Sequence, residues 1–266
     1  MLLEIYQADA FTHTPFKGNP AGVCITNKGL SEALMLSIAG EMAISETAFL
    51  SLDDMNLRWF TPKIEVNLCG HGTLATAHVL LQQGKMKIGD EVTFQTKSGP
   101  LTVYFSEHDI AMDFPLAPLT LNTPINEEML AYLGISNKDV ITVGRFDTKD
   151  FIVIKQVEVL KRLQPNFDGL KQLTGRGVVI TALSNDSQYD FISRYFAPWA
   201  GVNEDPVTGS AHCALAAYWS AELKKDKLIG YQASQRGGEV KIEMLDNQRV
   251  KLSGQAVTTL KGIMTV

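Results

Sequence analysis

The sequence predicts an α/β (α+β) protein of two similar domains, each a curved, mostly antiparallel sheet or barrel around a central buried helix. Three observations predict this fold: an internal repeat, two long uncharged helical segments that each start at a glycine, and alternating apolar residues in the segments that follow them. A helix without a polar face has to be buried, and alternation of apolar and polar residues is typical of strands. The two helices are therefore expected inside the sheets.

An internal repeat divides the chain into two copies of one unit. Residues 58–62 read Arg-Trp-Phe-Thr-Pro and residues 194–198 read Arg-Tyr-Phe-Ala-Pro, an offset of 136 positions. A length of 266 residues fits one large domain or two small ones. The repeat favours two, residues 1–117 and 118–266, with a C-terminal strand that can cross back to the first domain. After a three-residue insertion, identical residues continue at an offset of 139: Glu65 and Glu204, Gly70 and Gly209, Ala75 and Ala214, Ala77 and Ala216, Gly99 and Gly238.

The two central helices are expected near residues 70–84 and 209–224. No Asp, Glu, Lys or Arg lies at positions 66–84 or at positions 206–221. A helix at a protein surface shows a polar face, so these two are expected to be buried within their domains. The small residues along them would let strands approach closely: Ala75, Ala77, Ala214, Ala216 and Ala217.

The remaining elements are predicted from capping residues and from alternation. A helix is expected over residues 31–43, capped by Ser31, and a shorter one after Asn126, closed by Gly134. The three prolines of residues 115–124 make this segment the best candidate for a linker between the halves. Alternating apolar residues predict strands at 20–26, 46–52, 110–114, 151–155 and 177–183.

Composition and charge exclude several classes of protein. Apolar residues make up 45% and charged residues 20%, which is an ordinary globular composition. The net charge is −5 and there is no block of Lys and Arg, so the chain lacks the basic surface that binds nucleic acids or anionic membranes. No apolar run is long enough for a transmembrane helix, and Glu4 and Asp9 stand where a signal peptide would be apolar. We therefore expect a cytoplasmic protein without nucleic-acid or membrane partners.

Glu46 is the first candidate for chemistry. Aligning Thr47 with Thr181 places Glu46 opposite Ile180, so that one half carries an acid where the other carries a hydrocarbon. A carboxyl group in apolar surroundings is expected to have a raised pKa, which suits a general acid or base. The alternative is a glutamate on the solvent-facing side of a strand.

The starts of the two central helices are the second candidate. Residues 69–72 read Cys-Gly-His-Gly and residues 208–211 read Thr-Gly-Ser-Ala. Helix N-termini present N–H groups without helical partners and the positive end of the helix dipole, and glycines let a ligand approach the backbone. Two such starts that face each other across a cleft would hold a carboxylate and stabilise negative charge that develops beside it. The alternative is that both are plain helix caps, and neither matches a nucleotide-binding P-loop.

Polar residues near these helix starts complete the candidate site. His71 can shuttle a proton near neutral pH, and Asp205 can orient an amine or a hydroxyl group of a substrate. The plainer interpretations are that Asp205 and Ser210 are ordinary helix-capping residues and that His71 is a packed turn residue.

The spacing of Cys and His residues does not indicate a metal site. Cys69, His71 and His78, or else His212 and Cys213, could form a ligand set, but no Cys-x-x-Cys or His-Glu-x-x-His spacing supports either. Three cysteines are an odd number in a chain of this length, which favours reduced thiols over disulfides. Cys24 and Cys213 are expected to be buried small apolar residues.

Motifs spread over the chain carry a family resemblance. They lie at residues 9–11, 16–23, 45–49, 58–62, 69–71 and 204–211, and the similarity runs from near residue 8 to Gly254, essentially the whole chain. Together these motifs resemble the PhzF family, the phenazine-biosynthesis-type isomerases. Any one of them alone would be a weak signal.

The resemblance implies a diaminopimelate epimerase-like fold, with an active site between two similar α/β domains, a homodimer, and no cofactor. It also implies a biosynthetic isomerase that moves a proton on a small carboxylate-bearing substrate. The family's catalytic glutamate falls on Glu46, and two further catalytic residues fall on His71 and Asp205. The substrate-binding residues beside the bound carboxylate fall on four positions: Gly70, Gly72, Gly209 and Ser210.

Two other functions fit these residues. Racemases of the wider fold group use two cysteines, one at each helix start, whereas this chain has Cys69 at the first start and Thr208, a poor base, at the second. A one-thiol enzyme similar to epimerases and racemases that uses Cys69 is therefore one alternative. The other is a small-molecule-binding protein that has kept the site and lost turnover.

Overall fold

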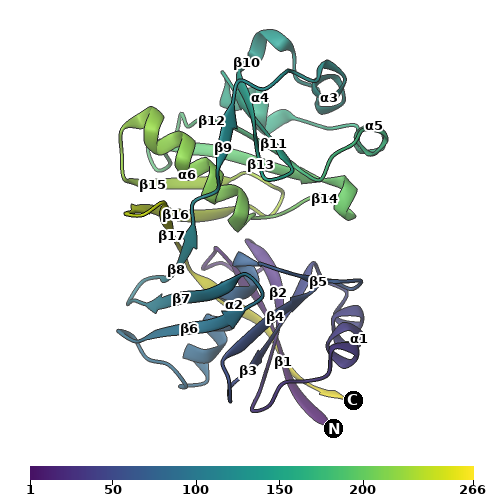
Figure 1. Ribbon diagram of the computed structural model, residues 1–266, viewed down its shortest axis with the longest axis vertical. Helices are drawn as coiled ribbons and strands as arrows, with labels where there is room; N and C mark the ends of the chain where they lie inside the picture. The colour runs from purple at the N-terminus through teal and green to yellow at the C-terminus, as the bar shows by residue number, and fades with distance from the viewer. The chain divides into compact units, whose positions relative to one another are not determined.

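The computed structural model describes all residues, 1–266, and they divide into two units. The first unit contains residues Met1–Phe114 and Lys251–Val266, and the second contains residues Pro115–Val250. The chain leaves the first unit at the end of β8 (Ile110–Pro115) and returns to it within β17 (Arg249–Gly254). Each unit has its own arrangement of strands and its own buried helix (Figure 1).

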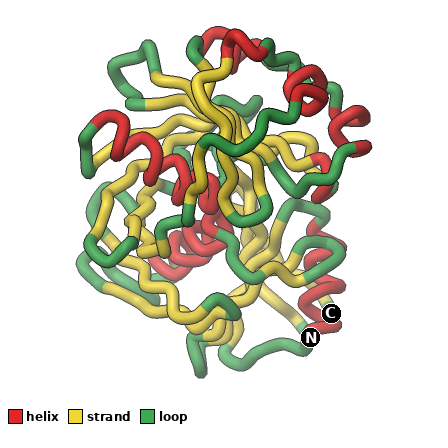
Figure 2. The backbone as a smooth tube through the Cα atoms, turned by 45° about the horizontal axis from the view of Figure 1, so that its top comes forward, coloured by secondary structure: helices red, strands yellow, loops and turns green.

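The strands of the first unit form a mostly antiparallel sheet. Its parallel pairs are β2 (Asn19–Thr26) with β3 (Glu46–Ser51) and β4 (Asn56–Phe60) with β6 (Glu91–Thr96). The two ends of the chain lie side by side in this sheet, because Leu2 pairs with Thr265 (Figure 2). The strands pair in the order β18 (Ala256–Thr265), β1 (Leu2–Ala10), β2 (Asn19–Thr26), β3 (Glu46–Ser51), β4 (Asn56–Phe60), β6 (Glu91–Thr96), β7 (Gly99–Phe105) and β8, and β5 (Glu65–Val66) also pairs with β4.

The second unit repeats this pattern of pairing. Its parallel pairs are β11–β12 and β13–β15, which correspond to β2–β3 and β4–β6 of the first unit. The internal repeat predicted from the sequence is therefore confirmed at the level of strand topology. The strands pair in the order β9 (Leu119–Leu121), β10 (Val140–Phe146), β11 (Lys149–Ile154), β12 (Val178–Leu183), β13 (Phe191–Ala197), β15 (Lys227–Gln232) and β16 (Gly238–Leu245), and β14 (Val202–Glu204) also pairs with β13.

The segment predicted as the linker contains a short strand. The second unit begins within residues 115–124, at Pro115, and β9 lies in the same segment and pairs with β10 through Leu119 and Phe146. Prolines flank this short strand at positions 118 and 124 and leave its three residues able to join the sheet edge.

The two uncharged helices are buried, as predicted. Helix α2 (Gly70–Gln82) packs on β1, β2, β3 and β18, and ten of its 13 residues are buried. Helix α6 (Gly209–Leu223) packs on β9, β15 and β16, with nine of its 15 residues buried. An Asp, Glu, Lys or Arg side chain on the inward faces of these helices would have to give up its hydration, and the absence of these four residue types permits the burial.

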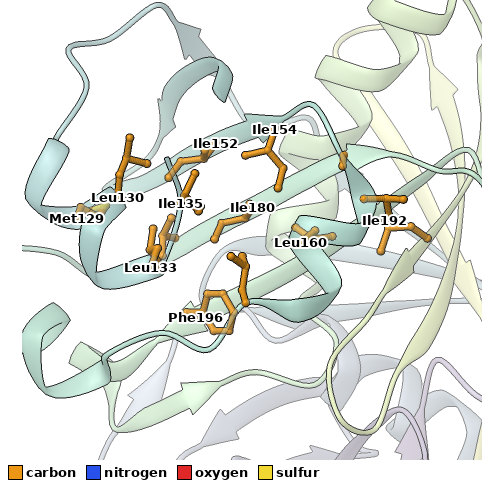
Figure 3. Packing of buried hydrophobic residues seen from close by; sticks show 14 of the residues in the cluster. Met129, Leu130, Leu133, Ile135, Ile152, Ile154, Leu160, Ile180, Ile192 and Phe196 are labelled. Atoms are coloured by element: carbon orange, nitrogen blue, oxygen red, sulfur yellow. The ribbon is translucent and has the colours of Figure 1, made fainter. Parts of the chain in front are cut away.

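Shorter helices cover the opposite faces of the sheets. Neighbouring residues of β1 point to opposite sides: Ile5 packs with helix α1 (Glu32–Met42), whereas Tyr6 packs with α2. Ser31 caps α1, as predicted, by accepting a hydrogen bond from the Leu34 amide. In the second unit, α3 (Glu127–Leu133), α4 (Val157–Arg162) and α5 (Phe167–Gln172) cover an apolar face of β11, β12 and β13 (Figure 3). Both sheets are therefore buried on two sides.

The repeated Arg-aromatic-Phe motif forms the same ion pair in each unit. Arg58 on β4 makes two hydrogen bonds of 2.7 and 2.6 Å to Glu65 on β5. Arg194 on β13 makes two of 2.7 and 2.9 Å to Glu204 on β14. Each guanidinium also lies over the ring of the phenylalanine two residues later, at 5.1 Å in the first unit and 4.8 Å in the second. The ion pairs fix the short strand that leads into each central helix.

No helix of the structure is both long and apolar enough to span a membrane.

The three cysteines are free thiols, and Cys24 and Cys213 are buried, as predicted. Helix α3 also matches its prediction, since Asn126 caps it and Gly134 ends it at a positive φ of 76°.

The ion pair of the second unit predicts a difference between two Arg→Lys variants. Arg194 is mostly buried, with 11% of its side chain exposed, and it also donates to the carbonyl groups of Leu160 and Leu163. The single ammonium group of a lysine cannot reproduce the planar set of guanidinium donors that reaches Glu204 and both carbonyl groups. Arg194→Lys should therefore lower the free energy of unfolding by about 2 kcal/mol or more. Urea unfolding followed by circular dichroism measures this.

The matched control is Arg145→Lys. The Arg145 side chain is 62% exposed and makes one ion pair with Asp150, so this change should alter stability by less than about 0.5 kcal/mol. Equal midpoints for the Arg194 and Arg145 variants would show that the repeated ion pair does not stabilise the unit.

Candidate active site

The start of helix α2 is shaped by Cys69 and Gly72. Cys69 is the N-cap residue, and its sulfur accepts a hydrogen bond from the Gly72 amide at 3.3 Å. A Cβ atom on residue 72 would lie 2.8 Å from Trp59 Cδ1 and 3.0 Å from the Cys69 sulfur, so only glycine fits there. Trp59 belongs to the repeated motif on β4, which therefore holds the helix start in place.

Glu46 and His71 meet at this helix start. Glu46 is the first residue of β3, and His71 is the second residue of α2. The Glu46 Oε2 atom lies 3.1 Å from His71 Nε2, and the Ser45 hydroxyl lies 3.4 Å from the same nitrogen. On the other side of the ring, the Asn19 amide nitrogen lies 3.3 Å from His71 Nδ1. His71 is thus held from both edges of its ring, and 7% of its side chain is exposed.

The structure corrects the expected direction of the Glu46 pKa. Burial alone would raise it, but the hydrogen bond and the charge of His71, with a hydrogen bond from Ser45, outweigh burial and lower the pKa of Glu46. Burial likewise opposes the charged form of His71, yet hydrogen bonds of its ring to the Cys69 sulfur and to Glu46, together with the charge of Glu46, raise the pKa of His71 well above its usual value. The sequence places apolar residues around Glu46 but does not show that an imidazole lies beside it.

Cys69 is a neutral thiol beside this pair. Burial raises its pKa, and the neighbouring His71 only partly opposes that shift. The sulfur lies 3.6 Å from His71 Nδ1 and 3.7 Å from Nε2. Nearly equal distances mean that the sulfur is aligned with neither N–H direction, so its contact with the ring is weak. Near neutral pH the charge opposite His71 is therefore carried by Glu46.

The strand register corrects the position that corresponds to Glu46 in the second unit. Arg58 pairs with Phe49 on β3, and Arg194, its counterpart, pairs with Ile180 on β12. Ile180 therefore corresponds to Phe49 and not to Glu46, and the alignment of the two Thr-Ala pairs is three positions out of register.

The true counterpart of Glu46 is Gly177, the residue before β12. A Cβ atom on this residue would lie 2.1 Å from the Tyr195 hydroxyl oxygen. Where the first unit has a carboxylate, the second has no side chain, and the space belongs to a tyrosine whose pKa burial raises. Only the first unit supplies a glutamate at this point of the repeat.

A hydrogen-bond network surrounds the start of helix α6. The Thr208 hydroxyl donates to Asp205 Oδ2 at 2.5 Å. The buried side chain of Gln232 accepts from the Thr208 amide at 2.9 Å and donates to the Asp205 carbonyl oxygen at 2.7 Å. Asp205 and Ser210 both lie near this helix start, as predicted, and the N-cap residue itself is Thr208.

Lys149 is a residue that the sequence did not reveal. Its ammonium group lies 3.4 Å from the Ser210 hydroxyl and 3.6 Å from Asp147, and 13% of its side chain is exposed. Burial lowers the pKa of Lys149, and the charge of Arg176 acts in the same direction. The ammonium group and the positive end of the helix dipole repel each other. An anion bound near Ser210 would be attracted by both and would reduce this repulsion.

The predicted residues thus fall into two groups. In the first unit, Glu46 and His71 are in contact beside Gly70 and Gly72. In the second unit, Asp205 lies beside the helix start that carries Gly209 and Ser210. Asn19 and Ser45 lie inside two of the motifs noted in the sequence, whereas Lys149 and Gln232 lie on β11 and β15 without a motif that marks them.

The chain matches known proteins over its whole length. The family model for phenazine biosynthesis-like proteins, PhzC-PhzF, matches residues 8–262. A protein of Halalkalibacterium halodurans named as an uncharacterized isomerase is 46% identical over 263 residues, which cover 98% of each chain. The crystal structure of a PhzF family protein of Enterococcus faecalis superimposes with a TM-score of 0.91 at 39% identity and covers 100% of both chains.

A more distant neighbour shares the fold alone. A hydroxyproline epimerase of Agrobacterium vitis matches with a TM-score of 0.60 at 9% identity, over 98% of this chain and 92% of that one. The mixed α/β fold of two similar halves, which the sequence predicted, is thereby confirmed. On the family match and the 46% identity, this chain belongs to the phenazine biosynthesis-like PhzC-PhzF family.

Proposed function

We propose that the protein is a cofactor-independent isomerase that moves a proton on a small carboxylate-bearing substrate, with Glu46 as the general acid and base. The observation that carries this proposal is the contact of 3.1 Å between Glu46 and His71 at the start of α2. The name of the Halalkalibacterium halodurans relative as an isomerase supports the class of reaction.

The lowered pKa of Glu46 suits the first step. A base has to be ionised before it accepts a proton, and pairing with His71 keeps the carboxylate ionised near neutral pH. The carboxylate takes a proton from an activated carbon, and the electron pair of the broken C–H bond enters the conjugated system of the substrate. Glu46 then returns the proton to another carbon, so atoms and electrons balance without a co-reactant.

The amides at the starts of the central helices are the proposed donors to a substrate carboxylate. In the first unit these are the amides of Gly70 and Gly72, and in the second unit those of Gly209 and Ser210, because the first amides of a helix have no partner within it. The Gly72 amide already donates to Cys69, so it contributes less than its neighbours.

Lys149 and Asp205 give the second helix start its selectivity. The ammonium group of Lys149 beside Ser210 adds a positive charge, which favours an anionic substrate in a protein whose net charge is −5. Asp205, held by the Thr208 hydroxyl, is placed to orient an amine or hydroxyl substituent.

The assembly and location follow the family resemblance. We propose a cytoplasmic homodimer, so sedimentation equilibrium should give twice the chain mass of 29.2 kDa. A mass of one chain at micromolar concentration would overturn this part of the proposal.

Glu46→Gln should nearly abolish turnover. The amide keeps the size of the side chain and can still contact His71, but it cannot accept the proton, so kcat/KM should fall by about 10²–10⁴. The measurement is exchange of carbon-bound hydrogen in D₂O with a panel of unsaturated cyclic carboxylic acids, followed by NMR.

The control is Glu41→Gln, an exposed glutamate of α1, which should leave exchange unchanged. Circular dichroism of both variants checks folding. If Glu46→Gln exchanges hydrogen at the wild-type rate, the proposed mechanism is wrong. If the wild-type protein binds such an acid and catalyses no exchange, the binding-protein alternative holds.

Cys69→Ala separates the proposal from a one-thiol epimerase. A buried neutral thiol is a poor base, so this variant should keep turnover within about tenfold of wild type, while Glu46→Gln loses it. The same D₂O experiment measures both. The opposite order, with loss in Cys69→Ala and retention in Glu46→Gln, would assign the chemistry to the thiol.

A further inference from the structure

Three possible metal ligands converge at the start of α2. The ligand atoms of Glu46, Cys69 and His71 all lie within 4.8 Å of one another. The Glu46 oxygen and the Cys69 sulfur are 3.1 and 3.7 Å from the same nitrogen, His71 Nε2. The sequence grouped Cys69 and His71 with His78, but His78 lies elsewhere, against Thr258, and Glu46 takes its place.

These separations fit one tetrahedral ion. Zinc binds oxygen, nitrogen and sulfur ligands at about 2.0–2.3 Å, which sets neighbouring ligand atoms roughly 3.3–3.6 Å apart. The oxygen and the sulfur are at about these distances from His71 Nε2, and binding would draw the sulfur and the oxygen, which lie within 4.8 Å of each other, around the ion. Three protein ligands would leave the fourth position to water, reached from the side of Glu46, whose side chain is 21% exposed.

We propose that Glu46, Cys69 and His71 form a Zn²⁺ site whose occupation inhibits the enzyme. The inhibition rests on the function proposed above, whereas the binding does not. A bound ion would hold the Glu46 carboxylate oxygen that otherwise accepts the proton, so the ion acts as a reversible inhibitor and not as a cofactor.

The residues around the three ligands support this assignment. Ligands of a metal are normally oriented by partners in a second layer. Asn19 contacts His71 Nδ1 and so leaves Nε2 directed toward Glu46. The Gly72 amide holds the Cys69 sulfur in place. Asn19 is the first residue of β2, and the Gly72 amide belongs to the backbone of the helix start.

The donor types select the ion. Thiolate and imidazole favour Zn²⁺ and Co²⁺, whereas Mg²⁺ prefers oxygen ligands and octahedral geometry. The site should therefore bind Co²⁺ as a spectroscopic substitute for zinc and ignore millimolar Mg²⁺.

The binding experiment titrates Co²⁺ into the reduced full-length protein without oxygen or substrate. The wild type should develop a thiolate-to-cobalt charge-transfer band, which Zn²⁺ then removes by displacing Co²⁺. Cys69→Ala should lose the band, and Glu46→Gln should weaken Co²⁺ binding by at least about tenfold. Cys213→Ala, which removes a buried thiol of the second unit, is the matched control and should behave as wild type.

The cobalt titration tests the three-ligand site directly. Absence of the band in wild type, its persistence in Cys69→Ala, or unchanged affinity in Glu46→Gln would overturn the three-ligand site. A second experiment measures D₂O exchange with and without Zn²⁺. Inhibition with the midpoint of zinc binding supports the proposal, and full activity of the zinc-loaded protein overturns the inhibition. If no exchange occurs even without zinc, the proposed function fails while the cobalt data still decide the metal site.

Discussion

Burial of an uncharged helix within a sheet is the constraint on which each unit depends. Helix α2 and helix α6 have no Asp, Glu, Lys or Arg along their buried turns, so strands can enclose both without taking such a side chain out of water. The first turn of such a helix still presents amide groups that its own backbone cannot pair. The same feature that builds the core therefore also supplies donors for an anion, and the chemistry gathers where each helix begins.

The two units share one fold but carry different side chains at the starts of their central helices. Thr73 donates its hydroxyl to the Cys69 carbonyl oxygen in α2, and at the matching position of α6 the ring of His212 donates to the Thr208 carbonyl oxygen. His212 is fully buried, and burial lowers its pKa to about 4, so it is a neutral structural residue. The histidines near the two helix starts thus differ in charge. His212 stays neutral, whereas the nearby carboxylate of Glu46 favours the charged form of His71.

Much of this could be predicted from local sequence. The repeat, the caps of α1 and α3 and the buried helices follow from spacing and residue type. The counterpart of Glu46 in the second unit could not be predicted in this way. The register of β12 is set by its pairing with β13, and the short Thr-Ala matches carry no information about that pairing. The roles of Lys149 and Gln232 could not be predicted for a related reason, since the helix-start residues that they contact, Ser210 and Thr208, lie more than twenty residues away in the chain.

The direction of the Glu46 pKa shows how a single neighbour reverses an argument from burial. Apolar surroundings alone favour a protonated acid, yet one imidazole at 3.1 Å restores the ionised form. The imidazole can do this because Asn19 and Ser45 hold it in place and because the adjacent Cys69 stays neutral. An ionised carboxylate, a histidine and a thiol within a few ångströms suit proton transfer, and the same three donors suit a thiophilic cation. A cation bound to these three donors would occupy the carboxylate that the proposed reaction needs as its base.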